Sequence, residues 1–325
     1  MPQDIQSSDN AELAQLLKSS GDELRLRILR ALSTDSFGVL ELCTIFDTKQ
    51  SGMSHHLKVL ANAQLVTTRK EGNSIFYRRA PLQNDDAFAA VKAAIFKSVD
   101  TLELKEEQNT NLQEIYRQRS QASTHFFTEN AAEFKKQQDL IAAFDVYENH
   151  VQEFVDNSKP PKHEIALEVG PGAGEFLQTL AKQFSRVVAL DNSNEMLEQA
   201  RAHCSALNLN NVEFVHNDTS HCRDLPEQVD CAVINMVLHH VPSPQQLIND
   251  VAKALTKSGV LIICDLCQHD QDWTRDACGD LWLGFAPEDL CRWATENNLL
   301  EGQSSYFALR NGFQIQLREF IKLDS

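Results

Sequence analysis

The sequence of 325 residues lacks any apolar run near the ~20 residues that a membrane-spanning helix needs. Its first residues also lack the basic stretch and following apolar segment of a secretory signal. We therefore expect a cytoplasmic protein. A general basic character is absent as well, because 30 Lys and Arg stand against 46 Asp and Glu, a formal net charge of −16. Any binding of nucleic acid must therefore depend on a local patch.

Paired cysteine motifs are scarce. The eight cysteines are scattered, and only Cys264 and Cys267 form a C-x-x-C pair. No second pair completes the spacing of a zinc site. Cys264 ends the apolar run VLIIC, where buried thiols are common. We interpret these cysteines as structural residues of a reducing compartment, and we predict no metal site.

Charge is distributed unevenly along the chain. Residues 1–100 carry 12 basic and 12 acidic side chains, whereas residues 101–325 carry 18 and 34. Within the neutral part, residues 49–79 hold six Lys and Arg against Glu71 alone. Such a local basic patch is a candidate phosphate-binding face, and a solvated helix face is the alternative.

The neutral part has the pattern of a small helical domain with a hairpin. Apolar spacing predicts four helices, and residues 1–10 are polar and expected to fray. The predicted helices are Ala11–Lys18, Leu24–Leu32, Val39–Phe46 and Lys49–Ala61. Val66–Thr68 and Ile75–Tyr77 are β-like and are joined by RKEGNS with a Gly-Asn turn, so they predict a hairpin. Helices followed by such a hairpin form an α+β winged helix-turn-helix domain.

Over about the first 80 residues, the chain resembles the ArsR/SmtB-type winged-helix regulators. The resemblance is carried, in order, by ELRLRILRAL, ELCTIF, QSGMSHHLKVLANAQLV and TTRKEGNSIFYR. It implies that the fourth helix enters the major groove of double-stranded operator DNA and that the hairpin follows the backbone. The residues that would contact DNA are Lys49, Gln50, Ser51, Ser54, His55, Lys58, Arg69, Lys70 and Arg78.

The metal sites of this family are incomplete in the sequence. Metal-sensing members carry C-x-C on the third helix, whereas here Ile45 follows Cys43 at the second position. The predicted helix Asp85–Val99 lacks the His and acidic ligands of the other common site. We therefore do not expect metal or arsenic sensing at these positions. The apolar face of that helix would form a homodimer contact, as in the family, through Phe88, Val91, Ile95 and Val99.

A charged helix over Leu102–Gln121 is predicted to connect two domains. One or two helices are predicted within His125–Val155, and they are rich in aromatic residues. These aromatic side chains either belong to the core or cover a bound ligand. The expected organisation is a winged-helix domain in residues 1–100, a connector in 101–122 and a second domain in 123–325.

The second domain is organised around ALEVGPGAGEF, Ala166–Phe176, which predicts a buried strand, a glycine loop and a helix. Such a loop presents N–H groups to a nucleotide-like ligand. The next strand, Arg186–Asp191, ends in a carboxylate that can accept hydrogen bonds from both hydroxyls of a ribose. A dinucleotide fingerprint would need glycine where Glu175 stands, so NAD is the weaker alternative.

The pattern from Glu168 to Gly174, acidic-x-G-x-G-x-G, resembles motif I of the class I S-adenosylmethionine (SAM) methyltransferases. The resemblance covers about residues 120–325. It implies an α/β Rossmann-like fold with a seven-stranded, mostly parallel sheet and a terminal antiparallel hairpin, whose turn is Asn311-Gly312. It also implies SAM as cofactor, with S-adenosylhomocysteine as product or effector. The cofactor contacts would be Glu168, Gly170, Gly172, Gly174, Asp191, Asn192, Asp218, Thr219 and Asn235.

The sequence says less about chemistry. The fourth strand ends in Asn235-Met236 without the Pro-Pro-aromatic signature of amino-methyltransferases, so we do not expect methylation of a nucleic acid base or of glutamine. His239 and His240 follow, as candidate general bases or as capping and packing histidines. The segment Cys264–Phe285 resembles ArsR-type proteins fused to a methyltransferase domain. Its candidate acceptor-binding residues are His269, Asp270, Trp273 and Asp280.

These observations predict a dimeric, DNA-binding regulator whose second domain binds SAM and methylates a small molecule. One alternative is a sensor in which SAM or S-adenosylhomocysteine changes operator binding without methyl transfer. The lowest-ranked alternative is arsenite methylation, for which the grouped thiols would be Cys264, Cys267 and Cys278.

Overall fold

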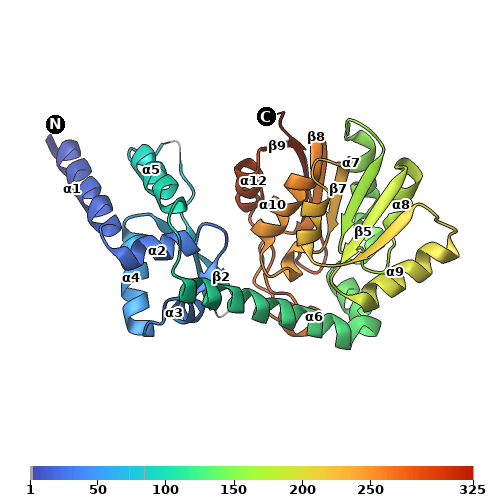
Figure 1. Cartoon of the computed structure of the whole chain (residues 1–325), viewed down its shortest axis with the longest axis horizontal. Coiled ribbons are helices and arrows are strands. Elements are labelled where there is room, and N and C mark those ends of the chain that lie inside the picture. Colours follow the sequence, from blue (N-terminus) through green and yellow to red (C-terminus); the bar gives the residue numbers. More distant parts are fainter. Residues whose placement is uncertain (1–2, 73, 84, 325) are drawn as a thin grey trace. The chain divides into compact units, whose positions relative to one another are not determined.

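The computed structural model describes residues 3–72, 74–83 and 85–324. The chain forms two compact units, Met1–Gln118 and Arg119–Ser325 (Figure 1). Their boundary falls within one helix of 37 residues, α6 (Glu106–Ala142), so the predicted connector and the start of the following helical segment are a single element. None of the helices in the described residues has the length and apolar character to span a membrane.

Five helices precede α6. α3 (Val39–Phe46) has the predicted bounds, and α4 (Gln50–Asn62) is shifted by one residue. The remaining helices are α1 (Gln3–Ser20), α2 (Glu23–Ala31) and α5 (Ala89–Asp100). The expected fraying of residues 1–10 is wrong from Gln3 onward, because α1 already begins there. α2 begins one residue before the predicted Leu24, because the Asp22 side chain accepts the N–H of Arg25 and caps the helix.

The predicted hairpin is confirmed as β2 (Val66–Glu71) and β3 (Ser74–Arg79), which pair antiparallel. Asn73 of its turn lies outside the described residues. A third strand, β1 (Phe37–Gly38), pairs with β3 and gives the order β1-β3-β2. A strand of two residues shows no alternation in the sequence, so it was not predicted. The unit is a winged helix-turn-helix.

The core of the first unit lies between its helices. On α4, Met53, Leu57 and Leu60 are fully buried, as their spacing predicts. Val99 of α5 is buried in the same core, and the other three apolar residues of the predicted dimer face pack against it while half-buried. These are Phe88, Val91 and Ile95. The predicted dimer face therefore belongs in part to the core of its own unit.

The second unit is built on a seven-stranded sheet, and the predicted fold class is confirmed. The strands are β4 (Ile165–Val169), β5 (Arg186–Asp191), β6 (Val212–His216), β7 (Val229–Asn235), β8 (Leu255–Leu266), β9 (Leu299–Ala308) and β10 (Gln314–Lys322). Their order is β6-β5-β4-β7-β8-β10-β9, and β10 runs in the opposite direction to the other six strands. The strand order reverses at β4, where open α/β sheets bind their ligands.

Helices cover both faces of this sheet (Figure 1). One core joins the sheet to α7 (Phe144–Asn157), α8 (Leu177–Gln183) and α9 (Asn194–Ala206). The remaining elements are α10 (Pro244–Ala254), α11 (Trp273–Cys278), α12 (Pro287–Glu296) and the short 3₁₀ helices η1 (Thr219–Asp224) and η2 (Leu238–His240). η2 and α11 lie just beyond the carboxyl ends of β7 and β8, so the fold brings both to the binding edge.

Candidate functional site

The glycine loop after β4 has the conformation that its sequence predicts. Gly170, Gly172 and Gly174 have φ angles of 66°, 56° and 83°, a region that side chains rarely adopt. A Cβ on Gly170 would lie 2.5 Å from Val237 Cγ2, and one on Gly174 would lie 2.9 Å from Ala200 Cα. A Cβ on Gly172 would meet no atom within 4 Å. Packing therefore requires the first and third glycines, whereas the second borders open space.

Two acids stand beside this loop, one buried and one half-buried. Glu168 is 2% exposed near the end of β4, and burial raises its pKa to about 8. Asp191 ends β5, where its Oδ1 accepts the N–H of Ser193 at 2.8 Å, and burial raises its pKa to about 6. β4 and β5 are adjacent and parallel, with Val169 opposite Leu190. Asp191 and the glycine loop therefore share one edge of the sheet.

The remaining predicted cofactor residues follow the same edge. Asp218 is exposed and caps η1 by accepting the N–H of Ser220, and the Thr219 hydroxyl donates to Asp250. The carbonyl of Asn192 is 3.1 Å from His216 Nε2. The Asn235 amide, at the end of β7, is buried beside Glu168, where its hydrogen bond to that carboxyl partly offsets the effect of burial on the pKa of Glu168.

A buried histidine and a carboxylate meet at the ends of β7 and β8. His239, in η2, places its Nδ1 2.7 Å from Asp265 Oδ1. Asp265 also accepts the N–H groups of Leu238 and Leu266. Asp265 was missing from the predicted site residues. Its signal in the sequence is a carboxylate at the end of the apolar strand SGVLIICD, the same pattern that marked Asp191.

Asp280 completes a cluster with both histidines. Its Oδ1 lies 3.9 Å from His239 Nε2 and 3.6 Å from His240 Nδ1. Burial lowers the pKa of His239, but the carboxylates of Asp265 and Asp280 outweigh it and raise the pKa to about 9. Burial and the neighbouring His239 lower the pKa of His240 well below its ordinary value. The nitrogen and oxygen atoms of His239, His240 and Asp280 are close enough to hold a metal ion.

Part of α6 covers this cluster. Arg119 donates to the carbonyl of Pro242 and lies over the ring of Trp282. Ser123 donates to the carbonyl of His240, and the edge of the Phe127 ring contacts the His240 ring at 5.1 Å between centroids. The covering segment therefore begins within the predicted connector, earlier than the expected residues 125–155.

The other predicted acceptor residues, His269, Asp270 and Trp273, do not belong to the cluster of His239, His240 and Asp280. His269 and Trp273 pack against Phe313, with ring centroids 4.8 and 6.0 Å away, and Asp270 is exposed. Burial raises the pKa of Cys264 well above its ordinary value, that of Cys267 to about 11 and that of Cys278 to about 12. Burial therefore disfavours the thiolate form of all three side chains.

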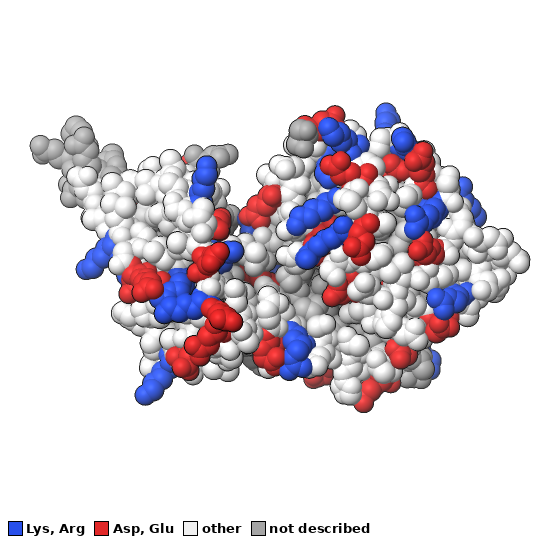
Figure 2. Space-filling model, in the orientation of Figure 1, with Lys and Arg blue, Asp and Glu red and all other residues white. Residues whose placement is uncertain are grey.

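The candidate DNA-binding residues of α4 share one exposed face. Gln50, Ser51, Ser54, His55 and Lys58 are exposed, opposite the buried face of the helix. Lys49 is exposed at the N-cap position, without a side-chain capping hydrogen bond. Figure 2 shows that Lys and Arg are mixed with Asp and Glu on the face in view, rather than gathered on one basic surface.

The hairpin requires one correction. Lys70 is exposed and Arg78 is half-buried, so both side chains remain compatible with a contact to the DNA backbone. Arg69, however, is only 6% exposed, and its guanidinium forms an ion pair with Glu71, which is 1% exposed. The predicted DNA contact of Arg69 is therefore incompatible with its position.

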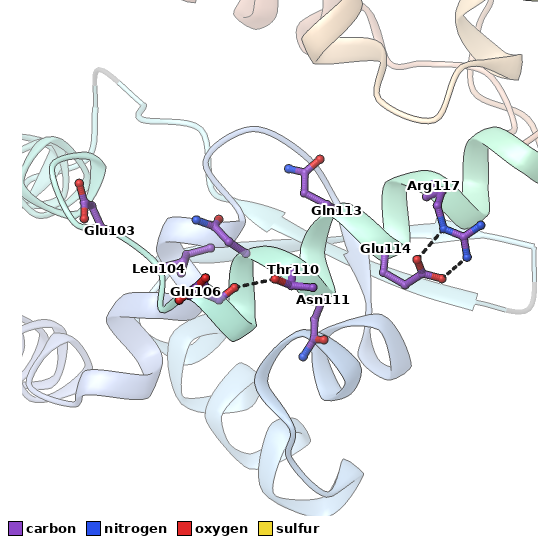
Figure 3. Close-up of a pocket in the computed structure, with 9 residues that line it drawn as sticks. Glu103, Leu104, Glu106, Thr110, Asn111, Gln113, Glu114 and Arg117 are labelled. Atoms are coloured by element: carbon purple, nitrogen blue, oxygen red, sulfur yellow. Dashed lines mark hydrogen bonds and ion pairs between the residues drawn. The ribbon is translucent and has the colours of Figure 1, made fainter.

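An open hollow of about 790 Å³ lies along the beginning of α6 in the first unit (Figure 3). Within α6, Thr110 donates to the carbonyl of Glu106 and Arg117 to Glu114, whereas Asn111 donates to the carbonyl of Thr44 in α3. The bond from Arg117 lowers the pKa of Glu114 to about 2. The hollow is lined by Glu103, Leu104, Glu106, Asn109, Thr110, Asn111, Gln113, Glu114 and Arg117.

Comparison with known proteins agrees with both halves of the structure. A methyltransferase domain model matches residues 167–263, and a helix-turn-helix domain model matches residues 21–69. The chain is 24% identical to the ubiquinone biosynthesis O-methyltransferase of Proteus mirabilis, over 46% of this chain and 66% of that protein. It is 42% identical to the arsenical resistance operon repressor of Staphylococcus aureus, over 21% of this chain and 64% of the repressor.

A solved structure supports the fold of the second unit. It contains a methyltransferase of Haloferax volcanii in complex with the Trm112 methyltransferase activator; the TM-score is 0.51 at 14% identity, over 61% of this chain and 98% of that one. The two sequence relatives are each matched over less than two thirds of their length. The chain joins an ArsR-type helix-turn-helix domain to a class I SAM-dependent methyltransferase domain.

Proposed function

We propose that the second unit transfers a methyl group from SAM to a small-molecule acceptor, and that the first unit binds operator DNA as a homodimer. The observation that carries the cofactor assignment is the open space at Gly172 beside the carboxylate of Asp191. Gly170–Gly174 would face the cofactor, Asp191 would accept from its ribose hydroxyls and Asp218 from its adenine amine. The buried amide of Asn235, beside Glu168, lies at the same edge.

SAM supplies an electrophilic methyl carbon when it is bound. The acceptor must attack this carbon in line with the bond to sulfur, so the main task of the protein is to position the two molecules and exclude water. The carboxyl ends of β7 and β8 are the acceptor side in our proposal. There Arg119, Ser123 and Phe127 of α6 cover η2, which favours a closed site.

We expect SAM affinity to fall about tenfold per pH unit as the pH drops below 6, because Asp191 must be ionised to accept both ribose hydroxyls. Its pKa of about 6 in the free protein lies above the ordinary value of 3.8. The side chain is therefore ionised at neutral pH and becomes protonated in mild acid. Calorimetric titrations with SAM across this range measure the slope. Asp191→Asn should bind weakly with a flat profile below pH 6, and an unchanged slope in that variant would contradict the ribose assignment.

The sensor alternative also finds support in the first unit. Cys43 is half-buried, burial raises the pKa of its thiol, and Ile45 replaces the second thiolate of the metal-sensing motif. An effector that is not a metal is therefore favoured, and SAM or S-adenosylhomocysteine are the candidates.

If the two sites are coupled, SAM or S-adenosylhomocysteine should change operator affinity by about 5- to 150-fold, and DNA should change cofactor affinity by the same factor. The measurement is a titration of operator DNA obtained by in vitro selection, with saturating SAM, with saturating S-adenosylhomocysteine and with neither. Three superimposable curves would contradict the sensor function and leave methyl transfer as the role of the second unit.

A further inference from the structure

The carboxylate of Asp280 is buried and only partly compensated. The residue is 3% exposed, and its carboxylate oxygens lack a well-formed hydrogen bond to any described residue. Thr274, whose hydroxyl donates to the carbonyl of Gln271, and Arg275 favour its charged form from nearby. Burying an ionised carboxylate is costly unless hydrogen-bond donors or a cation compensate it. The atoms that face it are ring nitrogens of His239 and His240 at 3.9 and 3.6 Å, both beyond hydrogen-bond distance.

His239 is oriented as a ligand toward this carboxylate. Asp265 already accepts two backbone N–H groups and lies 2.7 Å from His239 Nδ1, so Nδ1 carries the proton of the neutral ring and donates it to Asp265. Nε2 faces Asp280 and has no hydrogen-bond partner among the described residues; a metal ion bound there would displace the proton that the raised pKa of His239 places on Nε2 at neutral pH. A carboxylate that holds the far nitrogen of a histidine is the usual arrangement behind a metal-ligating imidazole.

His240 supplies a third ligand atom. One ligand atom from each of His239, His240 and Asp280 lies within 4.8 Å of the others, and all three residues are buried. Metal bonds of about 2.1 Å place tetrahedral ligands about 3.4 Å apart, so small side-chain movements close the site around an ion. His240 Nδ1 is also 3.3 Å from the carbonyl of Gly279, and coordination through that nitrogen would replace this contact.

We propose that His239, His240 and Asp280 bind one divalent transition-metal ion, with Asp265 orienting His239. Two imidazoles and one carboxylate favour Zn²⁺, Co²⁺, Fe²⁺ or Mn²⁺ over Mg²⁺ and Ca²⁺. Three protein ligands leave a coordination position open, as in catalytic sites. The metal site does not depend on the proposed methyl transfer, although it lies on the acceptor side. No spacing motif revealed it, because Asp280 is 40 residues from His240.

The test uses the full-length protein, freed of metal with a chelator and titrated with Co²⁺. We expect one Co²⁺ per chain, a visible absorption band and its loss when Zn²⁺ displaces the ion. Asp280→Asn and His240→Gln should abolish the band, and Asp265→Asn should weaken Co²⁺ binding about 10- to 100-fold. His163→Asn, at an exposed histidine of the same unit, is the matched control and should bind like wild type.

SAM binding by each variant checks that the second unit is folded, since the glycine loop is a separate element. A wild-type protein without the band would overturn the proposal. So would Asp280→Asn and His240→Gln variants that bind SAM and still bind Co²⁺ with wild-type affinity and spectrum. If one of these two variants fails to bind SAM, the Co²⁺ affinity of the other variant tests the proposal.

Discussion

Gly172→Val should reduce SAM affinity by at least about 100-fold, or roughly 2.8 kcal/mol, and leave operator binding by the cofactor-free protein unchanged. The first atom of the new side chain meets no protein atom within 4 Å, so it intrudes only on the space that we assign to the ligand. Calorimetry with SAM and a separate DNA titration measure the two effects.

The control must account for backbone strain, because Gly172 has a φ angle of 56° and a side chain there costs about 1–2 kcal/mol. Gly312 in the β9–β10 turn also has a positive φ, of 92°, and a Cβ there would have Gln271 Nε2 as its nearest contact, at 3.7 Å. Gly312→Val should therefore lose comparable stability but retain SAM binding. Equal losses of SAM affinity in both variants would show that strain, rather than ligand contact, explains Gly172.

Lys58→Glu should weaken operator binding by about 10- to 100-fold and make the salt dependence shallower, because it removes a cation and adds an anion on the exposed face of α4. Binding to operator fragments at several salt concentrations measures both. Lys105→Glu makes the same charge change at an exposed residue before α6 and should have little effect. Equal weakening by both substitutions would indicate a general charge effect and contradict recognition by α4.

The regular elements could be predicted because their information is local. Apolar spacing on α4 identified Met53, Leu57 and Leu60 as buried, and the run RVVALD identified β5 with its terminal carboxylate. The glycine loop could be predicted equally well, because strand, turn and helix follow one another directly and the positive φ angles need glycine at three nearby positions. Base contacts, the acceptor and the dimer stay predictions.

Boundaries and contacts between distant segments were harder. The long helix α6 spans both a predicted connector and the helical segment after it, because nothing within residues 121–125 ends a helix. Arg69 is a basic residue of the hairpin and was therefore predicted to contact DNA. In β2, however, side chains alternate between the two faces, so Arg69 lies on the buried side together with Glu71, two residues further along. Charge in the sequence does not show which side of a strand faces solvent.

By itself, the sequence determined the two kinds of fold, the mostly parallel sheet and the glycine loop at its edge, since periodicity and turn chemistry act over a few neighbouring residues. Only the tertiary structure decided which polar groups meet at the acceptor side. It placed Asp265 and Asp280 around His239 and left His269, Asp270 and Trp273 apart from them. The physical reason is that β7, β8 and the segment after α11 converge only once the sheet has formed, and burial then perturbs the groups that converge.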